Sequence, residues 1–186
     1  LVLLPGRYAV RPGRRADIDG DGVQDLVTSM SGTLFLHGRL PWPDTSVLDA
    51  DFLGWWSAAS VGTAGDFDGD GSVDLVLTTM EDGAYENAEG RVYLLLGPST
   101  GWSGYEADVE ASADAVWTHE NPLEDFGNFT DAADVTGDGL SDIVVLSGRS
   151  SQAYASDPDA YVRVLPGRSA GRWRGLGGVV VDVEGG

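Results

Sequence analysis

Four aspartates stand close together in the nine residues that begin at Asp66, at positions 1, 3, 5 and 9 of this stretch. Two carboxylates about 4 Å apart repel by roughly 1 kcal/mol in water and by roughly 4 kcal/mol at an effective dielectric near 20, so such a loop calls for a counter-ion. Hard oxygen donors, with no His or Cys nearby, favour Ca²⁺ over zinc or copper. We predict a calcium site formed by four side chains and one backbone carbonyl, from Asp66, Asp68, Asp70, Ser72 and Asp74.

The loop differs from an EF-hand, which closes with a bidentate glutamate at position 12. Position 12 is Leu77, and the segment 75–80 is rich in Val, Leu and Thr, which is typical of a buried strand and not of a helix. Gly69 and Gly71 allow the backbone to wrap the ion where a Cβ would clash. The pattern therefore predicts a nine-residue calcium loop that leads into a β-strand.

The same pattern occurs twice more, beginning at Asp17 and at Asp134, so the chain contains an internal repeat. Both copies lead into apolar segments, and neither has a glutamate at position 12. The third copy has Thr136 at position 3, which brings one charge fewer, so we expect this third site to bind calcium most weakly. The predicted ligands of these two sites are Asp17, Asp19, Asp21, Val23 and Asp25 in the first, and Asp134, Thr136, Asp138, Leu140 and Asp142 in the third.

Composition restricts the partners of the chain. The 186 residues are enough for one domain or repeat array, and a hydrophobic content of 42% is compatible with a folded protein. The formal net charge is −19, and three bound Ca²⁺ would leave it strongly negative, which argues against nucleic acid or an anionic membrane as partner. No apolar run reaches membrane-spanning length.

The location of the protein is inferred from its predicted ions. Calcium loops like those of extracellular modules need about 10⁻⁴ to 10⁻³ M calcium, which favours a secreted or cell-surface protein. The sequence has no cysteine, so calcium takes the place of disulfide cross-links. Because residues 1–4 are too short for a signal-peptide core and the chain begins without Met, we interpret it as a mature or excised piece.

Each predicted calcium loop stands between two strands of a four-stranded antiparallel meander. The strand before the loop is expected within 7–16, 57–65 and 126–133. The strands after the loop are expected at 25–30, 33–37 and 47–53 in the first unit, 75–80, 91–96 and 116–118 in the second, and 143–146, 161–165 and 178–183 in the third. No convincing helix is present.

Two further features accompany the loops. Phe126-Gly127 lies eight residues before Asp134, and the third strand ends in Gly97-Pro98 in the second unit and in Pro166-Gly167 in the third. With its calcium loops, the chain resembles the FG-GAP repeats of the integrin α-subunit β-propeller and of its bacterial relatives. The resemblance implies an all-β fold of propeller blades. The Phe-Gly pair is present in the third unit only, because its place is taken by Ala9-Val10 and Ala58-Ala59 in the others.

The predicted blades cover residues 7–54, 55–119 and 120–186, with residues 1–6 as a strand of a preceding or closing blade. Propellers have about 4–8 blades, so three cannot close a ring. Either the chain is a fragment of a longer propeller, which we favour, or copies associate. In both cases the bare ends of the array expose apolar surface that a neighbouring repeat would cover.

We expect partners to bind on the face opposite the calcium loops, where the long connections gather and which resembles the partner-binding face of integrin propellers. The candidate contact residues are Trp55, Trp56, Tyr85, His119 and Tyr154. Four tryptophans are more readily explained by packing between blades, namely Trp56, Trp102, Trp117 and Trp173. Asn128 fits the N-glycosylation pattern but lies on a predicted inner strand.

No catalytic residues are expected. His37 and His119 are far apart, and neither a cysteine nucleophile nor a Gly-x-Ser-x-Gly motif is present. Glu120, Glu124 and Asp125 are the one cluster that could serve glycan chemistry. The leading hypothesis is a non-catalytic, calcium-stabilised propeller module for extracellular adhesion or protein interaction. The alternative is a glycan-binding lectin or an accessory domain of a polysaccharide-active enzyme, which repeated loop aromatics would favour.

Overall fold

The computed structural model describes twelve stretches of the chain, and the statements below concern these residues. They are 15–17, 21–29, 33–36, 52–54, 59–79, 90–97, 104–106, 109–118, 126–127, 129–147, 161–173 and 180–182. Within them the chain forms thirteen strands and two helical turns of four residues, α1 (Val109–Ser112) and α2 (Ala170–Trp173). The prediction of an all-β fold is therefore confirmed.

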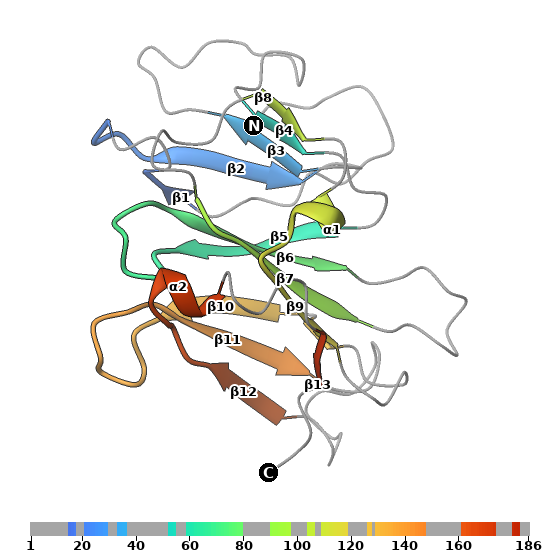
Figure 1. The fold of residues 1–186 in the computed structure, drawn as a ribbon. Coiled ribbons are helices and arrows are strands. Elements are labelled where there is room, and N and C mark those ends of the chain that lie inside the picture. The colour runs from blue at the N-terminus through green and yellow to red at the C-terminus, as the bar shows by residue number, and fades with distance from the viewer. Residues whose placement is uncertain are drawn as a thin grey trace.

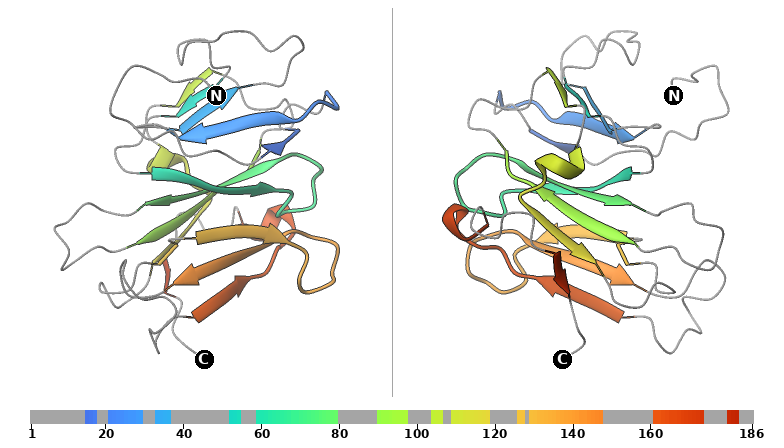
Figure 2. Two further views of the ribbon diagram at one scale, coloured as in Figure 1. Left: turned by 180° about the vertical axis from the view of Figure 1, so that it is seen from behind. Right: turned by 45° about the vertical axis from the view of Figure 1, so that its right-hand side comes forward.

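The strands form three separate open sheets that lie one above another in chain order, as in part of a propeller (Figures 1 and 2). The first sheet has the order β1-β2-β3-β4-β8, with bounds Arg15–Ala16, Asp25–Ser29, Thr33–Leu36, Phe52–Gly54 and Gly104–Glu106. The second has the order β5-β6-β7-β9-β13, with bounds Ala59–Gly65, Asp74–Thr79, Arg91–Leu95, Ala115–Thr118 and Val180–Asp182. The third has the order β10-β11-β12, with bounds Phe129–Ala133, Asp142–Ser147 and Tyr161–Leu165.

The four-stranded antiparallel meander predicted for each unit is present in the first and second units, whereas the described residues of the third unit form three of its strands. In every sheet the strand before the acidic loop pairs antiparallel with the strand after it, and that strand pairs antiparallel with the next. In the second sheet β9 supplies the antiparallel fourth strand, as predicted for residues 116–118. The strand predicted at residues 1–6 lies outside the described residues.

The outermost strands differ from the prediction in one respect. Residues 178–183 were expected to complete the third unit, but β13 pairs in parallel with β9 and so extends the second sheet. In the same way β8, which follows the third strand of the second unit, pairs in parallel with β4 of the first sheet. The physical reason is that an outer strand exposes unpaired backbone N–H and C=O groups. A later segment can pair with these groups even when they belong to the sheet of a preceding unit.

A hydrophobic core lies between the second and third sheets. Val76, Val92 and Leu94 of the second sheet are fully buried in one cluster with Ile143 and Val145 of the third. The opposite face of the second sheet is also buried, through Leu75, Leu77, Tyr93 and Leu95. A strand that is buried on both faces is apolar at nearly every position, which explains the continuous apolar run at residues 75–77.

Aromatic side chains join the second and third sheets. The ring of Trp173 meets that of Trp117 edge to face, with 5.5 Å between centroids and 85° between planes, and both are buried. The guanidinium carbon of Arg168 lies 5.3 Å from the Trp173 ring centroid. Packing between blades is thus confirmed for these two tryptophans, whereas Trp56 and Trp102 lie outside the described residues.

The Phe-Gly pair belongs to the same junction. Phe126 is fully buried in the shared core, and Gly127 has a φ of +81°. A Cβ on Gly127 would lie 2.8 Å from Cγ2 of Val92, and a Cβ on Gly90 would collide with the carbonyl oxygen of Phe126. The motif therefore fits a turn of the third unit against the β7 strand of the second, at a place too tight for a side chain.

Candidate metal centre

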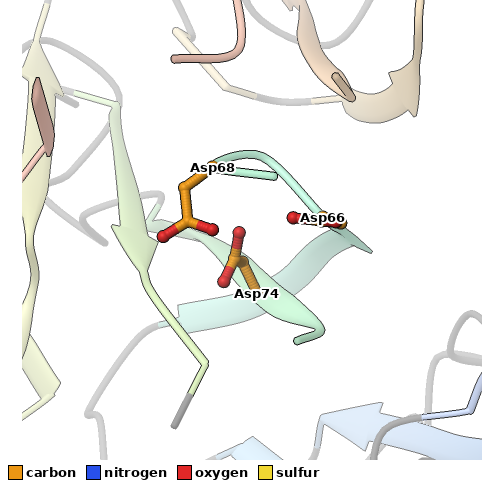
Figure 3. A group of neighbouring side chains, drawn as sticks. All are labelled: Asp66, Asp68 and Asp74. Carbon is orange, nitrogen blue, oxygen red and sulfur yellow. The ribbon is translucent and has the colours of Figure 1, made fainter. Parts of the chain in front are cut away.

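The second acidic loop gathers three carboxylates around one point. One oxygen each of Asp66, Asp68 and Asp74 lies within 4.8 Å of the others, and the carboxylates point toward one another (Figure 3). Two oxygens that ligate the same Ca²⁺ at 2.3–2.6 Å can be at most about 5 Å apart, so the spacing fits this ion. Asp74 is fully buried and Asp68 is 4% exposed.

Backbone hydrogen bonds give this loop its shape. The carboxylate of Asp66 accepts the N–H groups of Gly69 at 2.7 Å and Gly71 at 3.1 Å. Both glycines have positive φ, 78° and 85°, which non-glycine residues rarely adopt. The loop therefore turns around the Asp66 side chain, as the two glycines predicted. Asp70 is exposed, accepts the N–H of Ser72 at 2.7 Å and is not part of the group of three.

Asp74 lies at the base of the loop, at the start of β6, and each of its oxygens accepts one backbone hydrogen bond. Phe67 donates its N–H to Oδ2 at 2.7 Å, and Gly97 donates its N–H to Oδ1 at 2.7 Å. The pKa of Asp74 is raised to about 7, and burial is the largest cause. The two backbone hydrogen bonds lower the pKa, and the nearby carboxylates of Asp68 and Asp66 raise it. A buried carboxylate with two acidic neighbours is stabilised by a cation, so the donor set fits Ca²⁺.

The backbone of the third loop follows the same course, but the side chains at the centre of the loop make different hydrogen bonds. Asp134 accepts the N–H groups of Gly137 at 2.7 Å and Gly139 at 3.0 Å, as Asp66 does in the second loop. At position 3, however, Thr136 donates its backbone N–H to Asp142 at 2.9 Å and its hydroxyl at 3.4 Å. Within the described part of the chain, this loop gathers no group of three carboxylates.

Asp142 is the counterpart of Asp74, yet its surroundings differ. It also accepts the N–H groups of Val135 at 2.8 Å and Gly167 at 2.8 Å. Burial raises the pKa of Asp142, but the hydrogen bonds from Gly167, Thr136 and Val135 outweigh it and hold the pKa below its usual value. The negative charge of Asp142 is thus stabilised by N–H and O–H groups of the protein itself.

The first loop follows the pattern as far as it is described. Asp17 accepts the N–H of Gly22 at 2.9 Å, and Asp21 accepts the N–H of Val23 at 2.7 Å. Asp25, at position 9, is buried like its two counterparts. Asp19 lies outside the described residues, so a calcium site in this loop stays a prediction.

Gly97 and Gly167 have a role that the sequence did not reveal. Each follows the third strand of its sheet and donates its N–H to the position-9 aspartate. A Cβ on Gly97 would collide with the carbonyl oxygen of Val73, and one on Gly167 would lie 2.5 Å from that of Ser141. The available signal was the glycine beside a proline at the end of both strands, which sequence reasoning used only as a strand terminator.

The residues predicted to contact a partner are not described by the structure. Trp55, Trp56, Tyr85, His119 and Tyr154 all lie outside the described residues, as do Asn128, His37 and the cluster of Glu120, Glu124 and Asp125. Their roles stay predictions.

The geometry defines a class of protein, an all-β array of open sheets with an acidic loop between the first two strands of each. In agreement with this, residues 57–95 match the family model of the FG-GAP repeat, which covers β5, the second acidic loop, β6 and β7. The chain therefore contains an FG-GAP repeat in its second unit. No curated protein matches the chain. None of the helices in the described residues is long and apolar enough to cross a membrane.

Proposed function

We propose that the chain is a calcium-stabilised propeller module that binds other molecules outside the cell and has no catalytic role. FG-GAP repeats are typically non-catalytic interaction modules and occur in extracellular proteins, and residues 57–95 match this repeat. The observation that carries the proposal is the group formed by Asp66, Asp68 and Asp74. Three carboxylates this close together, two of them buried, repel one another unless a cation lies between them.

Calcium in the second loop would act on the architecture. Position 2 of this loop is Phe67, whose side chain is buried in the core between the second and third sheets. Its carbonyl oxygen accepts the N–H of Arg168 at 3.0 Å, from the connection after β12. An ion that orders the loop therefore also orders the contact between two blades. The proposed role of calcium is structural, and the binding surface is formed by loops held in place by these blades.

A calcium titration of the 186-residue protein tests the metal part. Isothermal titration calorimetry should give a dissociation constant for calcium of about 10⁻⁴ to 10⁻³ M, as for extracellular modules. At a calcium concentration 100 times the Kd, the free energy of unfolding should rise by about 2.7 kcal/mol. Asp68→Asn should abolish binding at the second loop. Asp131→Asn is the matched control, since it removes one exposed charge outside the loops. Equal heats for the two variants would disprove the assignment.

The interaction part needs a separate experiment. The proposed contact surface is the face opposite the acidic loops, with Trp55, Trp56, Tyr85, His119 and Tyr154 as candidates. A pull-down from extracellular material tests for a protein partner, and a glycan array run in parallel tests for a carbohydrate ligand. Alanine substitutions at the candidates should weaken capture and leave the calcium titration unchanged. Loss of both together would show that the substitutions damage the fold and do not touch a binding surface.

A further inference from the structure

The outward face of the third sheet exposes apolar side chains beside one acidic residue, Asp131, which stands in register with Val144. Phe129 of β10 is 65% exposed, and Val162 and Val164 of β12 are 62% and 41% exposed. Val144 and Leu146 of β11 stand beside them in register and are half-buried. These five residues, which we call the open face, form two neighbouring rows across the sheet. Such a face is unusual for a surface in contact with water alone.

The equivalent face of the second sheet is buried against the third sheet. Counted from the position-9 aspartates, Val144 and Leu146 correspond to Val76 and Thr78, and by the strand pairing Val162 and Val164 correspond to Val92 and Leu94. All four residues of the second sheet are buried. Three of them, Val76, Val92 and Leu94, belong to the core shared with the third sheet. The open face is therefore the surface that, one repeat earlier, binds the next sheet.

The contact between the second and third units also involves their acidic loops. Ser141 donates its backbone N–H to the carbonyl oxygen of Asp66 at 3.0 Å. A Cβ on Gly69 would lie only 2.7 Å from Cδ2 of Leu140, so the leucine side chain covers this glycine. Position 7 of one loop thus packs on position 4 of the preceding loop.

In the third loop and in the first loop, the residues that correspond to the two sides of this contact have no such neighbour in the described residues. Gly137, at position 4 of the third loop, has open space where Gly69 has Leu140. Val23, at position 7 of the first loop, is 39% exposed, and Gln24 beside it stands at the place of Ser141 and is also exposed. The register positions of Ile143 and Leu165 are held in the first sheet by Leu26 and Leu36.

We propose that two copies of the chain associate head to tail, so that the first sheet of each copy covers the open face of the other. Val23 then lies on Gly137 of the second copy, and the N–H of Gln24 faces the carbonyl oxygen of Asp134. Two copies bring six sheets, which is within the 4–8 blades of known propellers, so a closed ring is the arrangement that covers both open ends of each copy. This inference depends on the repeat architecture and not on calcium binding or on any partner.

The mass of the protein in solution tests the proposal. Sedimentation of the 186-residue chain over a wide concentration range, in millimolar calcium and enough salt to screen its charge of −19, should show a dimer. Val162→Glu should abolish the dimer, and the milder Val162→Thr should weaken it. Ser112→Glu adds the same charge at an exposed site on α1 and should leave the dimer intact. Tryptophan fluorescence and circular dichroism of each variant test whether it is folded.

A mixing experiment distinguishes head-to-tail from back-to-back association. A labelled Val162→Glu chain, monomeric alone, should still bind unlabelled wild-type protein, because its first sheet is intact. If two open faces instead met each other, the variant would bind neither itself nor the wild type, and the proposal would be wrong. A wild-type chain that stays monomeric throughout would also overturn it, and a blade of a longer polypeptide would then be the occupant of the open face.

Discussion

The indole Nε1 of Trp173 donates a hydrogen bond to the backbone carbonyl of Phe67 at 3.2 Å. Phe67 is the second residue of an acidic loop in the second unit, whereas Trp173 ends a helical turn that follows the third sheet. Both residues are buried. The hydrogen bond therefore fixes a loop of one blade to the connection of the next, and it places the candidate metal centre beside the junction between blades.

Trp173→Phe should destabilise the protein by about 2–3 kcal/mol, because it removes a buried hydrogen bond and leaves part of the ring volume empty. Arg168→Ala removes only a cation that lies over the same ring, and such contacts are worth about 0.5–1 kcal/mol at exposed sites. Denaturant unfolding of both variants measures the difference. Equal losses would mean that Trp173 contributes through its ring face and not through the hydrogen bond to Phe67.

The effect of Asp74→Asn should depend on calcium and that of Asp142→Asn should not, although both residues occupy position 9. Asp74→Asn should remove the stabilisation by calcium. In chelator it loses one of the two backbone hydrogen bonds that Asp74 accepts, but it also removes a charge buried beside two other carboxylates, so it should cost less than Asp142→Asn. Asp142→Asn should destabilise the protein by about 2–4 kcal/mol with or without calcium, because an amide cannot accept all the hydrogen bonds made to Asp142.

Thermal unfolding of each variant, once with calcium and once with chelator, gives the four stabilities that are compared. If Asp142→Asn lost stability only in calcium, the third loop would be a metal site like the second, and the hydrogen bonds to Asp142 would be secondary.

Local patterns in the sequence predicted much of this arrangement. The spacing of Asp66, Asp68 and Asp74 predicted the gathered carboxylates, and the apolar runs that follow each loop predicted β2, β6 and β11. These features depend on neighbouring residues only. A strand that follows a tight loop has one simple place to pair, which is beside the strand that precedes the loop.

The features that were missed depend on distant parts of the chain. Whether the position-9 aspartate is saturated by hydrogen bonds depends on a glycine 23 or 25 residues later. The position of β13 depends on which sheet edge lies open to a three-residue segment, and nothing in residues 180–182 specifies it. Weak calcium binding by the third loop stays a prediction, made from the missing charge of Thr136; the hydrogen bonds of this residue to Asp142 could not be predicted from the sequence.

Gly97→Ala should both destabilise the protein and weaken calcium binding. The new Cβ would collide with the backbone of Val73, so the strand end must move away and Asp74 loses a donor. We expect a loss of about 3 kcal/mol or more from overpacking and the broken hydrogen bond together.

Gly71→Ala is the control for this substitution. It has a φ of +85° and open space around its Cβ, so it should cost only about 1–2 kcal/mol of backbone strain. Unfolding in calcium and in chelator compares the two variants. A loss for Gly97→Ala no larger than for Gly71→Ala would contradict the packing role.

Thr136→Asp should convert the third loop into a stronger calcium site. The variant restores the carboxylate that the second loop has at position 3, and it removes the hydroxyl that donates to Asp142. Calorimetry should then show one more ion bound per chain, and the protein in chelator should be less stable because carboxylates about 4 Å apart repel by roughly 1–4 kcal/mol per pair. Thr136→Val also removes the hydroxyl but adds no charge, so extra calcium binding by that variant would refute this explanation.

Without calcium, the protein should lose stability as the pH rises from about 5 to about 7. The pKa of Asp74 is raised to about 7 by burial, from 3.8 for the free side chain. In this range the folded protein keeps a proton that the unfolded chain has lost, so deprotonation favours unfolding, by up to about 3 kcal/mol between about pH 5 and about pH 7. Above this pKa the dependence should level off.

Chemical denaturation in chelator, at several pH values from about 5 to about 8, measures this slope. Asp142 does not interfere, because its lowered pKa affects stability only in more acidic solution. Asp74→Asn should flatten the slope. Saturating calcium should flatten it as well, because the ion keeps Asp74 ionised in the folded protein, so that neither the folded nor the unfolded state holds this proton above about pH 5. A slope that the substitution leaves unchanged would show that another group is responsible and that Asp74 is ionised in the calcium-free protein throughout this range.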